Sequence, residues 1–114
     1  MQTEICARGF ELTSALRRAV ETEARELGRQ APRGVDAVSV RLFDANGPRG
    51  GPDKGCLVSL RLRGNRTSVV ASAIDTDLYR AIAGAFMKLE RAMRASVQRA
   101  RALRRRVPAP DAGA

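Results

Sequence analysis

The sequence predicts a single α+β domain in which four strands form a mixed sheet and two helices cover one face of it. Three observations predict this fold. The chain has 114 residues, of which 44% are hydrophobic, and this is enough for one buried core. Three segments alternate apolar and polar residues as half-buried strands do, a fourth strand is expected after a hairpin turn, and two longer segments repeat apolar residues at helical spacing. The order of these elements along the chain is βαβββα.

The first strand and the first helix are predicted from short local patterns. Thr3, Ile5 and Ala7 alternate with polar residues and predict a strand on which these three side chains face inward. Thr13 is a suitable N-cap for the following helix, because its hydroxyl can accept a hydrogen bond from the first turn. Apolar residues then recur at helical spacing as far as Gly28, which is expected to end the helix.

Three further strands are expected in the middle of the chain. Alternation is clear in residues 38–42 and again in residues 56–63. The segment between them, residues 44–55, is rich in glycine and proline and is expected to form a loop. Residues 64–65 predict a two-residue hairpin turn with glycine first. A fourth strand over residues 66–73 follows, although small and apolar residues fall on both of its faces.

A long amphipathic helix ends the predicted domain, which spans residues 1–106. Asp75, Thr76 and Asp77 offer capping oxygens and negative charge at its start, and an apolar stripe follows them. Extended to about Arg106, the helix would be about 45 Å long, whereas a strand of seven residues covers about 23 Å. Its last turns are therefore expected to project past the sheet. Residues 107–114 are expected to form a disordered C-terminal tail.

The connections between elements predict the sheet topology. A right-handed helical crossover makes the first two strands parallel, and hairpins make the other neighbouring pairs antiparallel. Both helices then lie on one face of the sheet, and the other face is left to solvent or to a partner. With the strands in chain order, another strand separates Cys6 from Cys56, so we expect no disulfide.

The charge balance predicts a polyanionic partner. The chain has 21 Lys and Arg residues against 12 Asp and Glu, a net charge of +9, and 19 of the 21 are arginine. Residues 58–114 hold twelve basic and four acidic residues, so they contribute +8 of this charge. Guanidinium groups form forked hydrogen bonds with phosphates, and a nucleic acid is therefore the expected partner.

The same composition argues against catalysis and against membrane insertion. The chain has no histidine, and its two cysteines match no zinc or redox spacing, so no catalytic site, metal site or cofactor is predicted. We accordingly expect no enzymatic activity and no small-molecule substrate. No apolar run approaches the roughly 20 residues of a membrane span, and a cytoplasmic protein is expected.

Basic residues on the polar side of the last helix are the first candidate RNA contacts. On a helical wheel they lie opposite the apolar stripe, and Glu90 and Asp77 interrupt them. They are Arg80, Lys88, Arg91, Arg94, Arg99, Arg101, Arg105 and Arg106. The alternative is an ordinary solvated face, but such a face normally mixes both charges. Arg104 instead falls on the apolar side, which indicates that the stripe has stopped packing there.

A second basic group is expected on the strands, on the open face of the sheet or at its hairpin end. Its members are Arg41, Arg61, Arg63 and Arg66. The alternative is that outward arginines serve solubility and prevent strand edges from pairing. The glycine-rich loop does not match a P-loop, and it either brings Arg49 and Lys54 to a phosphate backbone or is an ordinary hairpin connection.

The scarcity of aromatic residues bears on which form of nucleic acid is bound. The chain has one tyrosine and three phenylalanines, and Phe86 belongs to the apolar stripe of the last helix. Single-strand recognition by base stacking needs an aromatic platform, which is poorly supported here. Contacts from arginine to the phosphates of a folded RNA are favoured instead.

Two segments resemble a known family. Residues 11–17, ELTSALR, are similar to the entry into its first helix. Residues 77–82, DLYRAI, followed by residues 88–91, KLER, are similar to its second-helix signature. With the βαβββα order, the resemblance covers about residues 1–105 and is to the short-form ribosome hibernation promoting factors. This family includes the ribosome-associated inhibitor protein Y and the S30EA or sigma-54 modulation proteins.

The resemblance implies a fold similar to double-stranded RNA-binding domains and a non-enzymatic role. Such proteins bind the small ribosomal subunit in the channel for messenger and transfer RNA, and silence idle ribosomes under stress. Lys88, Arg91 and Arg94 would then contact ribosomal RNA, with Arg17 added from the first helix, and the bound form would be a monomer. The charge alone leaves an alternative open, namely a general structured-RNA-binding module or RNA chaperone without ribosome preference.

Overall fold

The computed structural model describes residues 1–44, 54–64 and 68–106, with side chains as far as Arg104. Its strands are β1 (Gln2–Arg8), β2 (Val35–Asp44), β3 (Lys54–Leu62) and β4 (Ser68–Asp75), and its helices are α1 (Ser14–Gln30) and α2 (Leu78–Arg106). The predicted order of elements is confirmed. The predicted C-terminal tail, most of the glycine-rich loop and all but Gly64 of the last hairpin turn lie outside the described residues.

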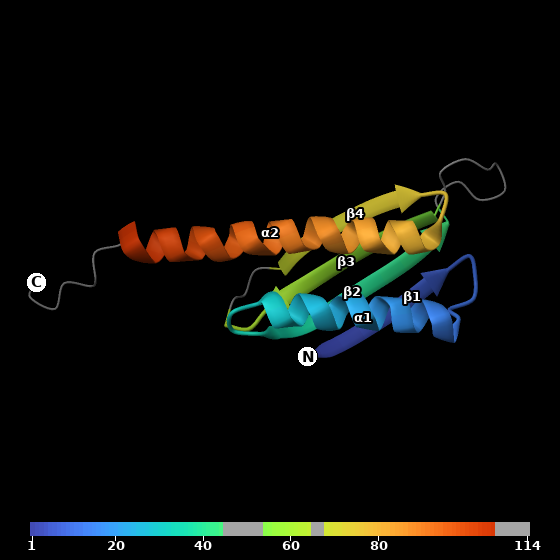
Figure 1. Cartoon of the computed structure of the whole chain (residues 1–114), viewed down its shortest axis with the longest axis horizontal. Helices are drawn as coiled ribbons and strands as arrows, with labels where there is room; N and C mark the ends of the chain where they lie inside the picture. Colours follow the sequence, from blue (N-terminus) through green and yellow to red (C-terminus); the bar gives the residue numbers. More distant parts are fainter. Residues whose placement is uncertain (45–53, 65–67, 107–114) are drawn as a thin grey trace, which may run out of the picture.

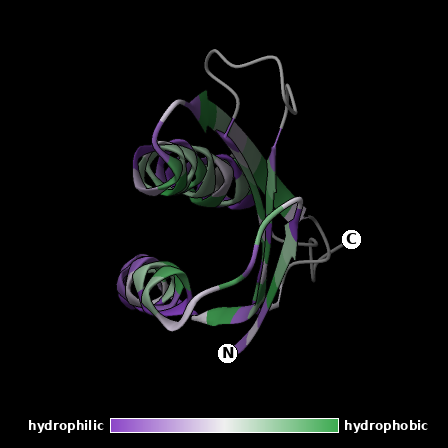
Figure 2. Cartoon of the chain, turned by 90° about the vertical axis from the view of Figure 1, so that its right-hand side faces the viewer, coloured by the Kyte–Doolittle hydropathy of each residue, from purple (hydrophilic) through white to green (hydrophobic). Residues whose placement is uncertain are grey.

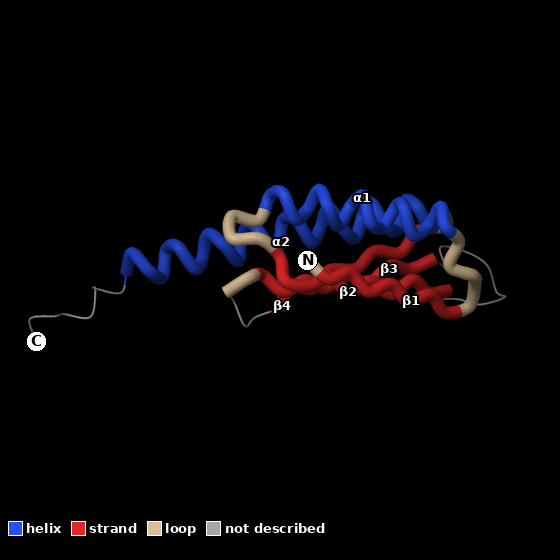
Figure 3. The backbone as a smooth tube through the Cα atoms, turned by 90° about the horizontal axis from the view of Figure 1, so that it is seen from below, coloured by secondary structure: helices blue, strands red, loops and turns tan. Residues whose placement is uncertain are grey.

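The four strands form one sheet in chain order, β1-β2-β3-β4. β1 pairs with β2 in parallel, whereas the β2–β3 and β3–β4 pairs are antiparallel. Both helices lie on the same face of the sheet, and the opposite face is open (Figure 1, Figure 3). The predicted α+β fold, with a mixed sheet and two helices on one face, is therefore confirmed.

The hydrophobic core lies between the sheet and the two helices. Val40, Val58 and Leu60 point from the central strands toward the helices and are almost completely buried. Leu89 and Met93 meet them from α2 and are at most 1% exposed. Figure 2 shows the two helices, viewed end-on, side by side over the same face of the sheet. Burial of this apolar surface is the main stabilising contribution to the fold.

Hydrogen bonds from backbone N–H groups to side-chain oxygens fix the start of each helix. The N–H group of Leu16 donates to Thr13 Oγ1 at 3.1 Å, which confirms the predicted N-cap. At α2, the N–H group of Tyr79 donates to Asp77 Oδ1 at 2.9 Å. Asp75 Oδ1 accepts from the N–H group of Asp77 at 2.9 Å, and this bond lowers the pKa of the Asp75 carboxyl.

Two local features differ from the sequence prediction. The helix α1 does not end at Gly28 but continues to Gln30, and Ala31 is extended. The reason is Pro32, since a proline disfavours the helical conformation of the residue before it. β2 is longer than predicted, and its pairing with β3 shifts register between Val35 and Ala37. A bulge of this kind adds one residue to one strand.

The helix α2 extends beyond the sheet, as predicted. Its 29 residues correspond to about 43 Å, against about 26 Å for the eight residues of β4. Figure 1 shows its C-terminal turns projecting past the ends of the strands. Within the described residues, no helix has the length and apolar character needed to cross a membrane.

Candidate nucleic-acid interface

The basic side chains of α2 form three rows along the solvent-exposed side of the helix. At 100° per residue, residues eleven positions apart lie within about 20° of each other, as do residues seven positions apart. The outermost row contains Arg80 and Arg91. The flanking rows contain Lys88 with Arg99, and Arg94 with Arg101. All six side chains are exposed, whereas the side chains of the other two predicted contacts on α2, Arg105 and Arg106, lie outside the described residues.

The two flanking rows face different neighbours. Lys88 Nζ donates a hydrogen bond to the backbone oxygen of Ser72 in β4 at 3.2 Å. On the other side, Arg94 donates to the side chain of Gln30 at the end of α1 at 3.0 Å. The basic surface of α2 therefore extends from the β4 edge of the sheet, across the outside of the helix, to the C-terminal end of α1.

Salt bridges neutralise a small part of this surface. Arg94 pairs with Glu90 at 2.8 Å, one helical turn earlier. Among the residues that the structure describes, Arg80, Lys88, Arg91, Arg99 and Arg101 form no salt bridge. The charge of Arg80 interacts with the Asp75 carboxylate, whereas Lys88, Arg91, Arg99 and Arg101 face solvent without a carboxylate partner among the described residues.

Three carboxylates line the groove between α1 and α2. They belong to Glu23 and Glu26 of α1 and to Glu90 of α2, beside Met87. Burial, with repulsion from Glu26 and Glu90, raises the pKa of Glu23. A polyanion that contacts α2 is therefore disfavoured in this groove and favoured on the outer and β4 sides of the helix.

Two of the predicted strand contacts, Arg41 and Arg61, do not join the surface of α2. Arg41 and Arg61 are exposed and lie on the open face, because the strand residues next to them point into the core. Val70 and Ile74 share this face and are 56% and 55% exposed. The open face is thus a mixed surface on the far side of the sheet from the helices (Figure 2).

Two other predicted contacts lie at the periphery. Arg17 is exposed on the first turn of α1, next to the cap at Thr13, and α1 is a separate helix from α2. Arg63 lies at the end of β3 and pairs with Asp36, in the bulged part of β2, at 3.4 Å. The predicted RNA contacts that the structure describes are thus spread over the α2 surface, the open face, α1 and one end of the sheet, and Arg66 lies outside the described residues.

The structure adds two arginines to the predicted contacts. Arg33, in the α1–β2 connection, and Arg104, on α2, line a pocket at the end of the sheet together with Arg63 and Arg101. The sequence indicated an unusual position for Arg104, because this residue falls on the apolar side of a helix that extends past the end of the sheet. The position of the Arg33 side chain could not be predicted in this way, because Arg33 lies in a turn and not in a helix or strand with periodic burial.

The cysteines do not form a reactive site. Cys56 points into the core and is completely buried, and burial raises the pKa of its thiol to about 12. Its thiolate is therefore absent at neutral pH. Cys6 is exposed on β1, one strand removed from β3, and both thiols are free.

This combination of fold and basic helix has relatives among known proteins. The family model described as "Sigma 54 modulation protein / S30EA ribosomal protein" matches residues 3–101. No curated protein sequence matches the chain. The N-terminal domain of Thermus thermophilus Protein Y is similar in structure, with a TM-score of 0.68 and 26% identity over 82% of this chain and 96% of that one.

A ribosomal subunit interface protein from Coxiella burnetii has the same fold. Its TM-score is 0.68 and its identity 19%, over 86% of this chain and 99% of that one. The family match spans nearly the whole described domain, from β1 into the last turns of α2. The chain therefore belongs to the family described as Sigma 54 modulation protein / S30EA ribosomal protein.

Proposed function

We propose that this protein is a ribosome hibernation factor that inhibits translation by binding the small ribosomal subunit in the channel for messenger and transfer RNA. The family to which it belongs is one of ribosome-associated interface and hibernation factors. In this proposal the protein acts in the cytoplasm, binds as a monomer and contacts ribosomal RNA through the exposed basic side chains of α2.

The observation that carries the proposal is the charge of α2. Residues 78–104 contain seven basic side chains and one carboxylate, that of Glu90. Like charges on neighbouring turns repel one another, so this arrangement costs stability in the free protein. A polyanion removes the repulsion and releases its own counterions on binding. Ribosomal RNA is the polyanion that the family membership indicates.

A folded RNA fits this surface better than a stacked single strand does. Phe43 is the one aromatic residue on the open face among those that the structure describes, and its ring lies over Gly55. Phe86 is buried, and Tyr79 is exposed on α2. A stacking platform needs two or three aromatic rings side by side on a sheet. Contacts from arginine and lysine to phosphates of structured RNA remain the mode that the described residues support.

The direct test reverses charges on α2. The variant Arg91→Glu/Arg99→Glu changes two exposed residues that lie away from the core. We expect it to lose co-sedimentation with ribosomes at physiological salt, because two attractive phosphate contacts become repulsive. The matched control, Arg18→Glu/Arg25→Glu, makes the same change of charge on exposed positions of α1 and should still co-sediment. If both variants co-sedimented with ribosomes equally well, α2 would not be the binding surface.

A competition experiment separates the proposal from the general RNA-binding alternative. Binding in the decoding channel predicts that transfer RNA and this protein displace each other from the small subunit. The alternative predicts comparable affinity for ribosomes and for an unrelated RNA duplex at physiological salt, because phosphate contacts contain no sequence information. Comparable affinities, with no competition by transfer RNA, would contradict the proposal.

A further inference from the structure

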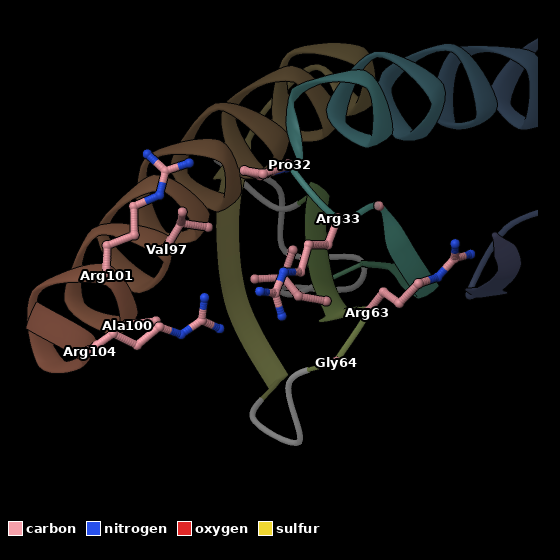
Figure 4. Close-up of a pocket in the computed structure, with 10 residues that line it drawn as sticks. Pro32, Arg33, Arg63, Gly64, Val97, Ala100, Arg101 and Arg104 are labelled. Carbon is pink, nitrogen blue, oxygen red and sulfur yellow. The ribbon is translucent and has the colours of Figure 1, made fainter. Parts of the chain in front are cut away.

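A pocket lies between the end of the sheet and the projecting part of α2 (Figure 4). It has a volume of about 380 Å³ and opens to solvent. Leu62, Val97 and Ala100 supply apolar surface, and four arginines surround it. These arginines are Arg33, Arg63, Arg101 and Arg104. We refer to this pocket as the arginine groove.

Two turns form the sheet side of the arginine groove, and a backbone hydrogen bond connects them. Gly34 and Gly64 have φ values of +87° and +78°, which favour glycine. The N–H group of Arg63 donates to the backbone oxygen of Gly34 at 3.1 Å, so the two turns are held against each other. The guanidinium of Arg33 passes close to Gly64, where an added Cβ would lie 3.7 Å from Nη1.

The charges in the groove are largely uncompensated. Arg63 pairs with Asp36, and Figure 4 shows its guanidinium turned away from α2. Arg33 and Arg104 extend toward each other from opposite walls in the same view. Within the described part of the chain, Arg33, Arg101 and Arg104 form no salt bridge. Guanidinium groups that converge across a groove repel each other unless an anion lies between them.

We infer that the arginine groove binds the phosphate groups of a single RNA strand. A groove of this volume is at the small end of the range of about 300–1,000 Å³ for ligand sites, so a strand can enter it but a double helix cannot. The apolar floor offers contact to a ribose or base, while the forked donors of Arg33 and Arg104 suit phosphate oxygens. This inference rests on the proposed function, in which ribosomal RNA supplies the strand.

The groove shares Arg101 with the basic surface of α2 but differs from that surface in its other residues. Arg33 lies outside α2. Arg104 contributes to the charge of α2 but falls on the apolar side of the helix, outside the three rows of its basic surface. The family match ends at residue 101, whereas α2 continues to Arg106. One wall of the arginine groove therefore depends on helical turns at and beyond the end of the family match.

The test uses the full chain and the variant Arg33→Gln/Arg104→Gln. Titration with a short single-stranded RNA oligonucleotide should show about tenfold weaker binding, as expected when one or more charge-assisted hydrogen bonds are removed. The slope of log K against log salt should fall by about 0.7 for each phosphate that the variant no longer neutralises. The control Arg18→Gln/Arg25→Gln removes the same charge from exposed positions of α1 and should match the unmodified protein. Unchanged circular dichroism and thermal unfolding would show that both variants are folded.

Equal weakening in the two variants would overturn the inference, because net charge alone would then explain the binding. Two other ligands decide what the groove accepts. Groove-dependent binding of pyrophosphate or of an acidic peptide as tight as that of the oligonucleotide would also overturn it. Ribosome co-sedimentation of Arg91→Glu/Arg99→Glu tests the proposed function separately. Failure of that surface and failure of the groove are therefore distinguishable.

Discussion

The guanidinium of Arg94 lies 2.8 Å from the carboxylate of Glu90 and also donates a hydrogen bond to Gln30 at 3.0 Å. These contacts connect the middle of α2 to the C-terminal end of α1. They also reduce the charge that Arg94 presents to a phosphate, because the Glu90 carboxylate competes for the same donors. Glu90 is the one acidic residue in residues 78–104, which contain seven basic residues.

Removal of this carboxylate should therefore strengthen polyanion binding. In Glu90→Gln, we expect tighter binding to ribosomes and a steeper salt dependence, by about 0.7–0.9 in slope if Arg94 then pairs with one phosphate. Stability should change by less than about 1 kcal/mol, since Arg94 is exposed and Glu90 is only partly buried, so solvent screens the pair. Sedimentation binding at several salt concentrations measures the effect. The control Glu4→Gln makes the same change of charge on β1, and an equal gain there would contradict a local role for Glu90.

The capping bond at the start of α2 should contribute measurably to stability. Asp77 Oδ1 accepts from the N–H group of Tyr79 at 2.9 Å, and loss of such a cap typically costs about 1 kcal/mol. We expect Asp77→Ala to lower the free energy of unfolding by about this amount in a denaturant titration. Asp77→Asn keeps an acceptor oxygen and should lose less. Equal losses in the two variants would show that charge at the helix start, rather than the hydrogen bond, is responsible.

Those parts of the fold that depend on periodic burial could be predicted from the sequence. Val38, Val40 and Leu42 alternate because the helices cover one face of β2 and leave the other open. Likewise, Ile82, Leu89 and Met93 recur at helical spacing because α2 packs on the sheet along one stripe. In both elements, contact with the core determines the pattern.

Two kinds of feature could not be predicted from the sequence. One depends on which of several neighbouring residues ends an element, and the other depends on which distant segments lie side by side in the fold. Pro32 determines the end of α1 although Gly28 is the more obvious stop signal. The bulge beside Asp36 places two residues between the buried Val35 and Val38, so regular alternation in the sequence begins only at Val38. Arg33 and Arg104 line the same pocket because the α1–β2 turn lies beside the part of α2 that extends past the sheet. These two segments are far apart in the sequence, so no local pattern indicates that they are neighbours.

The carboxylates between the two helices predict a pH dependence of stability. Burial, with repulsion from Glu26 and Glu90, raises the pKa of Glu23 above its ordinary value of 4.5. The folded state therefore holds a proton on Glu23 more tightly than the unfolded chain does. Its contribution favours folding at low pH and is lost as the pH rises through the raised pKa.

Glu23→Gln should therefore be more stable than the unmodified protein at pH 7, and this advantage should disappear below the ordinary carboxyl pKa. Because the side chain is only half-buried, solvent screens the repulsion, and we expect a difference of less than about 0.5 kcal/mol. Thermal unfolding from about pH 3.5 to pH 7.5, around the reference carboxyl pKa, measures it. Glu11→Gln removes an exposed carboxylate just before α1 and is the control. The same pH-dependent gain in that control would show that total charge, rather than the groove between the helices, governs the effect.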